Sequence, residues 1–258
     1  MKAVILAGGL GTRMREETEF KPKPMVEIGG KPILWHIMKI LSAQGIRDFV
    51  ICLGYRGQDI KRYFLDLPAL NNDFSIQIGK EPNIYRKNSG LLEDWHVTLV
   101  NTGALTPTAG RLLKVKHYLE GEPFLLTYGD GIANVDLTAL QKKHEELKTA
   151  VTITTTRPRS RFGVVDADST GLVHRFLEKP EGNEIVNIGY MIATAEIFDY
   201  LEEDSALEQK PLRSLASARR LGSYFHSGFW HPMDTIREAE QLNEIWDSGD
   251  VPWKIWSE

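Results

Sequence analysis

The sequence predicts an α/β fold with a single, mostly parallel, Rossmann-like mixed sheet that is flanked by helices and has antiparallel additions in its second half. Three observations predict it. Short apolar runs alternate with amphipathic helical patterns through the first half of the chain. A cluster of glycines directly follows the first apolar run, and after about residue 157 the alternation gives way to hairpin-like strands. Such an alternation is typical of a parallel sheet covered on both faces.

The expected alternation begins with a strand at residues 2–8, KAVILAG, whose continuous apolar run fits a strand buried on both faces. A helix is expected at residues 31–45, where apolar residues recur at helical spacing from Leu34 to Leu41 and Gly45 marks the end. The next strands are expected to be FVICLGY, FSIQI, VTLV, PFLLTYGD and VTITTT, at residues 49–55, 74–78, 97–100, 123–130 and 151–156. The helices expected between some of them are QDIKRYFLD, GRLLKVKHYLEG and LTALQKKHEELK, at residues 58–66, 110–121 and 137–148.

The second half of the chain predicts strands that turn back on themselves. FGVV and LVHRFLEK, at residues 162–165 and 172–179, flank the turn-forming stretch DADSTG and predict a hairpin. Further strands are expected at VNIGYMIA and YFHSGFW, residues 186–193 and 224–230. A final helix is expected from Thr235, with an inward face made of Ile236, Ala239, Leu242 and Trp246.

The stretch at residues 80–95 fits no element well. It is polar and long enough to be a functional loop or an arm that reaches another subunit. No linker, repeat or low-complexity segment divides the chain. We therefore expect one domain over residues 1–258, in which the pattern changes between residues 1–157 and 158–258.

Composition and charge narrow the class of protein. The chain has 258 residues, of which 42% are hydrophobic and 26% charged, as is ordinary for a globular enzyme. Its net charge of −4 gives no support for a nucleic-acid partner, which favours a basic face. Cys52 is the only cysteine, and within the apolar run FVICL it is expected to be a buried, inert thiol. With no signal peptide and no apolar window of membrane-spanning length, a cytoplasmic protein that does not contact membranes is expected.

The glycine cluster matches neither of the two familiar phosphate-binding motifs. Met14 stands where the dinucleotide fingerprint needs its third glycine, and no Gly-Lys-Ser/Thr follows as in the phosphate loop. The cluster still supplies Gly8, Gly9 and Gly11 at the carboxyl end of the first strand, where open α/β sheets bind ligands. Their bare amides can cradle anionic oxygens.

Basic residues follow the glycines. Arg13 offers a permanently charged fork, and Lys21 and Lys23 lie in a stretch, KPKPM, that its prolines should hold out of helix. Together these features predict a phosphate site. A tight turn followed by solvated basic residues is the structural alternative.

Two carboxylates are candidates for a metal site. Asp130 lies just past the apolar strand PFLLTY, one glycine beyond its end, although it could be a simple turn residue. Asp234 precedes the final helix, where an aspartate is usually an N-cap. Because Thr235 and Glu238 form a capping box by themselves, Asp234 lies one residue outside the cap and its carboxylate is available. Two carboxylates completed by substrate phosphates are how proteins generally hold Mg²⁺.

A transition-metal site at His226 and His231 is a weaker alternative. The spacing of five residues along a strand would place these side chains on opposite faces.

At these motifs the chain resembles the sugar nucleotidyltransferases, also called sugar-nucleotide pyrophosphorylases. It is most similar to their cytidylyl-transferring branch, which acts on glucose 1-phosphate. The matching stretches run in family order over essentially the whole length: LAGGLGTR, KPKPMVEIGGKPILWHIMK, GYRGQDIKRYF, WHVTLVNTG, GRLLKV, TYGDG, FGVV, FLEKP, GFWHPMDT and PWKIW.

The resemblance implies a nucleotide-diphospho-sugar transferase fold that joins CTP to a sugar 1-phosphate and releases pyrophosphate. Residues 1–157 would form the nucleotide-binding part and residues 158–258 the sugar-phosphate-binding and C-terminal part. The resemblance also implies a cytoplasmic homo-oligomer, such as a hexamer, that feeds deoxysugar synthesis for surface polysaccharide, including the O-antigen of lipopolysaccharide.

Site roles carry over residue by residue from the resemblance. The implied catalytic residues are Arg13, Lys23 and Lys179. Mg²⁺ would be held by Asp130 and Asp234. The implied nucleotide-binding residues are Leu6, Ala7, Gly8, Gly9, Leu10, Gly11, Thr12, Arg13, Lys23, Arg111 and Asp130. The implied sugar-phosphate-binding residues are Gly163, Glu178, Lys179 and Asn187.

The sequence departs from the family pattern at three positions: Asn101 replaces an aspartate, Ala109 a glycine, and Ile188 the first glycine of Asn-Gly-Gly. Ile188 would adjoin the sugar pocket and could reshape it. Three alternatives therefore stay open: a dTTP- or UTP-dependent transferase, a catalytically silent sugar-nucleotide sensor on the same fold, and an NAD-dependent oxidoreductase, against which the missing third glycine argues.

Overall fold

Seven strands form the central sheet of the computed structural model, in the order β14-β10-β13-β8-β1-β4-β7. The structure describes residues 1–256 except for residues 12, 13, 15–20, 72, 77–83, 87–92, 120, 159, 161 and 183. The sheet strands are β1 (Ala3–Ala7), β4 (Asp48–Leu53), β7 (His96–Asn101), β8 (Phe124–Tyr128), β10 (Val151–Thr156), β13 (Val186–Ala193) and β14 (Leu221–Phe225). The pairs β1·β4, β1·β8, β4·β7 and β10·β14 are parallel, whereas β13 runs antiparallel to both β8 and β10. The predicted mixed, mostly parallel sheet is confirmed.

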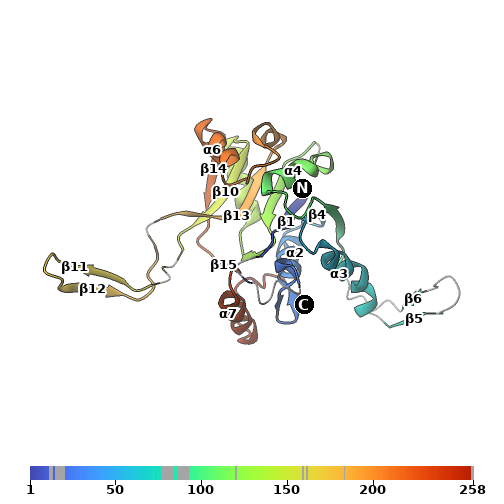
Figure 1. The fold of residues 1–258 in the computed structure, drawn as a ribbon, viewed down its shortest axis with the longest axis horizontal. Helices are drawn as coiled ribbons and strands as arrows, with labels where there is room; N and C mark the ends of the chain where they lie inside the picture. Colours follow the sequence, from blue (N-terminus) through green and yellow to red (C-terminus); the bar gives the residue numbers. More distant parts are fainter. Residues whose placement is uncertain are drawn as a thin grey trace.

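Helices cover both faces of this sheet (Figure 1). The main helices are α2 (Ile33–Ala43), α3 (Gly57–Leu70), α4 (Thr108–Lys114), α5 (Leu137–Leu147), α6 (Lys210–Ser217) and α7 (Ile236–Asp247). Alternate residues of β1 enter two separate cores, with Ile5 on the side of α2, α5 and α7 and Val4 on the side of α4 and α6. This is the burial that the continuous apolar run of the first strand predicts.

Short elements complete the fold. The 3₁₀ turns are η2 (Lys23–Met25), η3 (Lys116–Tyr118) and η4 (Ala195–Tyr200). The short strands form two pairs, β2 (Glu27–Ile28) with β3 (Lys31–Pro32) and β9 (Gly131–Ala133) with β15 (Trp230–Pro232). Among the described residues, no helix is long and apolar enough to cross a membrane.

Two antiparallel ribbons project from opposite sides of the body (Figure 1). One is the expected hairpin, β11 (Val164–Ala167) paired with β12 (Val173–Leu177). The other pairs β5 (Phe74–Ile76) with β6 (Ile84–Arg86). The stretch at residues 80–95, which fits no element by its pattern, therefore contributes strand β6, while residues 80–83 and 87–92 lie outside the described part.

Three local expectations were wrong. The stretch 224–230 is not one strand, because β14 ends at Phe225 and β15 begins at Trp230 to pair with β9. The helix expected at 110–121 is α4 followed by the separate turn η3. The prolines of KPKPM exclude an α-helix but permit the single 3₁₀ turn η2, which begins at Lys23.

Candidate active site

The glycine turn lies at the carboxyl end of β1 and is shaped by close contacts behind it. A Cβ atom on Gly8 would lie 2.1 Å from Nη1 of Arg111, and one on Gly54 would lie 2.3 Å from the carbonyl oxygen of Gly8. Gly9 has open space where a side chain would be, and Gly11 has a φ of +64°. Glycine is therefore required at positions 8 and 54 for packing and is favoured at 11 by its backbone.

Arg111 holds this turn from inside the protein. Only 4% of the residue is exposed, and Nη2 donates to the carbonyl oxygen of Gly8 at 2.8 Å. Nη1 donates to the carbonyl oxygen of Gly103 at 2.7 Å and to Oγ1 of Thr102 at 2.8 Å. Burial lowers the pKa of the Arg111 guanidinium. Since Arg111 lines neither of the cavities described below, its implied contact with nucleotide stays a prediction.

A cavity of about 180 Å³ opens in front of the turn. The structure brings most of the expected nucleotide and metal residues together here. Its lining residues are Leu6, Ala7, Gly9, Gly11, Lys23, Pro24, Gly129, Asp130 and Asp234. Leu10 lies beside it in the sequence and is 44% exposed, whereas Thr12 and Arg13 lie outside the described residues.

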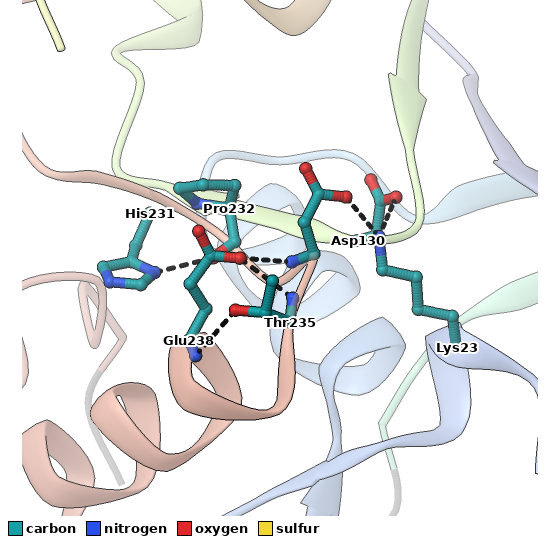
Figure 2. A network of polar contacts seen from close by, with 7 residues as sticks. Lys23, Asp130, His231, Pro232, Thr235 and Glu238 are labelled. Carbon is teal, nitrogen blue, oxygen red and sulfur yellow. Dashed lines mark hydrogen bonds and ion pairs between the residues drawn. The ribbon is translucent and has the colours of Figure 1, made fainter. Parts of the chain in front are cut away.

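One lysine bridges the two candidate metal carboxylates. Nζ of Lys23 donates to Oδ2 of Asp130 at 2.7 Å and to Oδ1 of Asp234 at 2.7 Å, as Figure 2 shows for the labelled Lys23–Asp130 pair. The Lys23 side chain is 11% exposed, so this contact is well shielded from water. Three segments far apart in the sequence thus meet at one point.

Backbone contacts position the main chain at both aspartates. The backbone N–H of Met233 donates to the carbonyl oxygen of Asp130 at 2.8 Å, next to the β9·β15 pairing, which ties the two segments together. The capping box of Thr235 and Glu238 is present as expected (Figure 2). Oε2 of Glu238 also accepts from the backbone N–H of Asp234 at 2.7 Å. Asp234 is therefore outside the cap, with its carboxylate directed to Lys23.

The donor set at this point fits a hard cation. Two carboxylate oxygens already surround one positive group at the edge of a cavity, and oxygen donors suit Mg²⁺. The described residues contain no group of three or more His, Cys, Asp or Glu side chains that could hold a metal ion. Substrate oxygens or water would therefore have to complete the coordination.

The two histidines near Asp234 are engaged elsewhere. Nε2 of His226 lies 3.1 Å from the carbonyl oxygen of Phe229, and Nδ1 of His231 lies 2.7 Å from that of Pro232.

Cys52 is buried, and burial raises the pKa of its thiol to about 12, which fits the expected inert thiol.

A second cavity of about 400 Å³ adjoins the first and shares Asp130 and Asp234 with it. Asn187, one of the implied sugar-phosphate-binding residues, lines it, and its role stays a prediction. Its lining residues are Thr127, Tyr128, Asp130, Gly131, Asn187, Ile188, Gly189, Glu208, Trp230, Pro232 and Asp234.

The remaining sugar-phosphate residues lie elsewhere. Gly163, Glu178 and Lys179 line neither cavity and belong to the base of the β11–β12 ribbon. The side chains of Glu178 and Lys179 are 63% and 55% exposed and lie 3.8 Å apart. Their role remains a prediction.

None of the three residues that depart from the family pattern lines the first cavity. Ile188 borders the second cavity but is only 6% exposed and packs into the core on the α2 side. Ala109 is completely buried in α4, and Asn101 lies at the exposed end of β7.

Sequence reasoning missed Tyr128, Glu208 and Trp230, which line the second cavity. The position of Tyr128, directly before Gly129 and Asp130, was the available signal.

A glycine-lined cavity at the carboxyl edge of a parallel sheet, with a lysine and two carboxylates, defines a class of α/β enzymes that act on phosphate groups. A sequence profile described as nucleotidyl transferase matches residues 2–230. The chain therefore belongs to the nucleotidyl transferase family.

Individual relatives agree with this assignment. The chain is 46% identical over 259 residues to the glucose-1-phosphate cytidylyltransferase of Salmonella typhi, covering 99% of this chain and 100% of that protein. It is 42% identical over 260 residues to the probable glucose-1-phosphate cytidylyltransferase of Bacillus subtilis (strain 168), covering 99% and 100%. A putative glucose-1-phosphate thymidylyltransferase from Bacillus anthracis, solved with sucrose, shares the fold with a TM-score of 0.69 at 17% identity, covering 100% of this chain and 98% of that one.

Proposed function

We propose that this chain transfers CMP from CTP to α-D-glucose 1-phosphate, giving CDP-glucose and pyrophosphate. The observation that carries the proposal is the convergence of Lys23, Asp130 and Asp234 at the cavity in front of the glycine turn. The names of the full-length relatives at 46% and 42% identity support the base and the sugar.

The reaction is an in-line displacement at the α-phosphorus of CTP. A phosphate oxygen of the sugar phosphate forms the new P–O bond while the bond to pyrophosphate breaks. The nucleophile is already an anion, so no covalent enzyme intermediate is needed. The main difficulty is the repulsion between two polyanions, and positioned charges are the usual remedy.

The residues of this chain divide that task. The backbone amides around Gly9 and Gly11 would bind phosphate oxygens of CTP, and Arg13 would add a charged fork. The Lys23 ammonium would pair with the reacting phosphates, and Lys179 with the sugar phosphate. Asp130 and Asp234 would hold Mg²⁺, which when bound offsets phosphate charge.

We also propose that the protein is a homo-oligomer. The β11–β12 ribbon exposes Val165, Val173 and Phe176 by 52%, 57% and 62%, and an isolated two-stranded ribbon is only marginally stable in water. A second copy of the chain would cover these side chains and give Glu178 and Lys179 a cavity to face. The hexamer implied by family resemblance is one such assembly.

Two further statements belong to the same proposal. The chain would form one nucleotidyltransferase domain, because β13 and β14 from its second half complete the sheet that begins with β1. The reaction would take place in the cytoplasm, where nucleoside triphosphates and sugar phosphates are available.

Pyrophosphate release tests the function directly. Purified protein is incubated with Mg²⁺ and glucose 1-phosphate, and CTP, UTP, dTTP, ATP and GTP are supplied in separate reactions. We expect release with CTP, or a strong preference for it. Preference for another nucleotide would support the proposed reaction but refute CTP as its substrate. No pyrophosphate release with any of the five nucleotides would refute the proposed reaction.

A further inference from the structure

The second cavity has a carboxylate at a place that the proposed chemistry does not use. Glu208 lines this cavity together with Tyr128, Asn187 and Gly189. It comes from the segment before α6, whereas the metal carboxylates Asp130 and Asp234 line the part shared with the first cavity. The cavity therefore has a carboxylate of its own besides the proposed metal ligands.

Two hydroxyl groups hold the Glu208 carboxylate. The phenol of Tyr128 donates a short hydrogen bond to Oε1, and Oγ1 of Thr108 donates to Oε2 at 3.2 Å. Oγ1 of Thr108 in turn accepts from the backbone N–H of Leu207 at 2.7 Å, which fixes the segment that carries Glu208.

The tyrosine itself is packed tightly. A Cβ atom on Gly189 would lie 2.5 Å from the Tyr128 ring, and Gly189 has a φ of +87°. The Tyr128 ring therefore packs directly against the backbone of Gly189, where β8 and β13 adjoin. Its phenol faces the Glu208 carboxylate and donates to it, so the packed ring fixes the direction of this hydrogen bond.

The charges of this cavity match the asymmetry of a sugar 1-phosphate. Such a molecule has a dianionic phosphate at one end and neutral hydroxyl donors around its ring. The described lining residues of the two cavities include one basic side chain, Lys23, which borders the shared end. Each carboxylate oxygen can accept more than one hydrogen bond, so Glu208 retains capacity for ring hydroxyls beyond its bonds to Tyr128 and Thr108.

We propose that Glu208, held in place by Tyr128, is a sugar-binding residue that accepts hydrogen bonds from ring hydroxyls of the sugar 1-phosphate. Its negative charge also disfavours the reversed orientation, so that the phosphate faces Lys23. This inference rests on the proposed function, because it assigns a residue to the sugar side of that reaction.

Steady-state kinetics with deoxy sugars test the assignment. We expect Glu208→Gln to lower kcat/KM for glucose 1-phosphate about tenfold to a hundredfold, with the KM for CTP changed less than about twofold, since a hydrogen bond to a charged acceptor has this effect. The same substitution is then measured with 2-deoxy-, 3-deoxy-, 4-deoxy- and 6-deoxyglucose 1-phosphate. For the analogue that lacks the hydroxyl bound by Glu208, the loss should fall to about threefold or less.

Two more variants complete the design. Tyr128→Phe keeps the ring but removes the donor, and we expect a smaller loss with the same dependence on the sugar. Glu202→Gln is the matched control, because Glu202 lies in the same segment but pairs with Lys210 and lines neither cavity. It should leave kcat/KM for glucose 1-phosphate unchanged.

The assignment is overturned if Glu208→Gln costs the same with every deoxy analogue, or if it raises the KM for CTP as much as that for the sugar. Failure of the proposed function looks different, since the wild-type protein would then release no pyrophosphate with any nucleotide. In that case calorimetric titration of wild type and Glu208→Gln with glucose 1-phosphate alone decides the role of Glu208. Equal affinity would refute it.

Discussion

The Nζ atom of Lys23 lies 2.7 Å from Oδ2 of Asp130, at the point where a divalent cation would bind between Asp130 and Asp234. The lysine thus offsets part of the negative charge of the two carboxylates. A cation and the Lys23 ammonium would repel each other at this distance, so metal binding requires Lys23 to leave the carboxylates. The released ammonium would then be available for phosphate oxygens.

This competition predicts the effect of Lys23→Met on metal affinity. Without the competing ammonium, Mn²⁺ should bind about tenfold more tightly in the absence of nucleotide, a change of about 1.4 kcal/mol. Electron paramagnetic resonance of free Mn²⁺ measures this without any turnover. Lys21→Met is the control, because Lys21 pairs with Glu27 at 4.0 Å rather than with the metal carboxylates. Unchanged or weaker binding of Mn²⁺ in Lys23→Met would contradict the competition between Lys23 and the cation.

The proposed metal-binding role of Asp130 and Asp234 predicts a second result. Asp130→Asn and Asp234→Asn should each lower kcat by about 10²–10³, since each removes one preorganised charge from the reacting phosphates. Circular dichroism should show that both variants stay folded. Asp247→Asn, at the exposed end of α7, provides the control. Near-normal turnover at saturating Mg²⁺ in either variant would remove that aspartate from the metal site.

The glycine turn predicts opposite outcomes for two alanine substitutions. Gly54→Ala would push a methyl group to 2.3 Å from the Gly8 carbonyl oxygen, so we expect a loss of roughly 1–3 kcal/mol in the free energy of unfolding. Gly9→Ala meets nothing within 4 Å in the protein and should change stability by less than about 0.5 kcal/mol. Because position 9 lines the first cavity, Gly9→Ala should instead raise the KM for CTP. Urea unfolding and kinetics of the two variants separate these effects, and the same pattern in both would contradict this description of the turn.

A buried histidine predicts how stability depends on pH. His36 is completely buried; its Nε2 lies 2.8 Å from the carbonyl oxygen of Ile28, and its Nδ1 accepts from Nε1 of Trp253 at 3.4 Å. Burial lowers the pKa of His36 from 6.5 to about 4. Between these values the unfolded chain binds the proton and the folded one does not. The stabilising contribution is therefore complete above pH 6.5 and is lost as pH falls toward 4, by about 3 kcal/mol in total.

Comparing wild type with His36→Gln isolates this contribution. The free energy of unfolding in urea should fall less between pH 7 and pH 4.5 in the variant than in wild type. Burial also lowers the pKa of His144, so His144 adds a slope of the same sign in both proteins and cancels in the difference. Equal slopes would show that His36 does not carry the effect.

Local signals made much of the site predictable from sequence. The capping box at Thr235 placed Asp234 outside the helix cap, and the apolar run before Asp130 placed that carboxylate at a strand end, because both signals lie within a few residues. That the two carboxylates share one lysine could not be read in this way. It depends on the pairing of β9 with β15, which joins segments about 100 residues apart.

The missed elements show the same limit. Helix α6 spans only Lys210–Ser217, too short for a clear periodicity, and its Leu215 is buried by packing beneath the sheet. Glu208 precedes this helix, so its place in the second cavity could not be predicted either. The hydrogen bond from Arg111 to the carbonyl oxygen of Gly8 is likewise a long-range contact, because the two residues lie 103 positions apart in the sequence.

The aromatic cluster around His36 gives this protein an optical signal of its own. Four tryptophans lie near its ring, with centroid distances of 5.0 Å for Trp35, 4.9 Å for Trp246, 6.2 Å for Trp253 and 6.4 Å for Trp256. Trp246 belongs to α7, the helix whose amino-terminal cap follows Asp234 directly. A displacement of α7 when a cation replaces Lys23 would therefore change the indole environment. A change in intrinsic fluorescence on adding Mg²⁺ would report such a displacement in unlabelled protein, without waiting for a product.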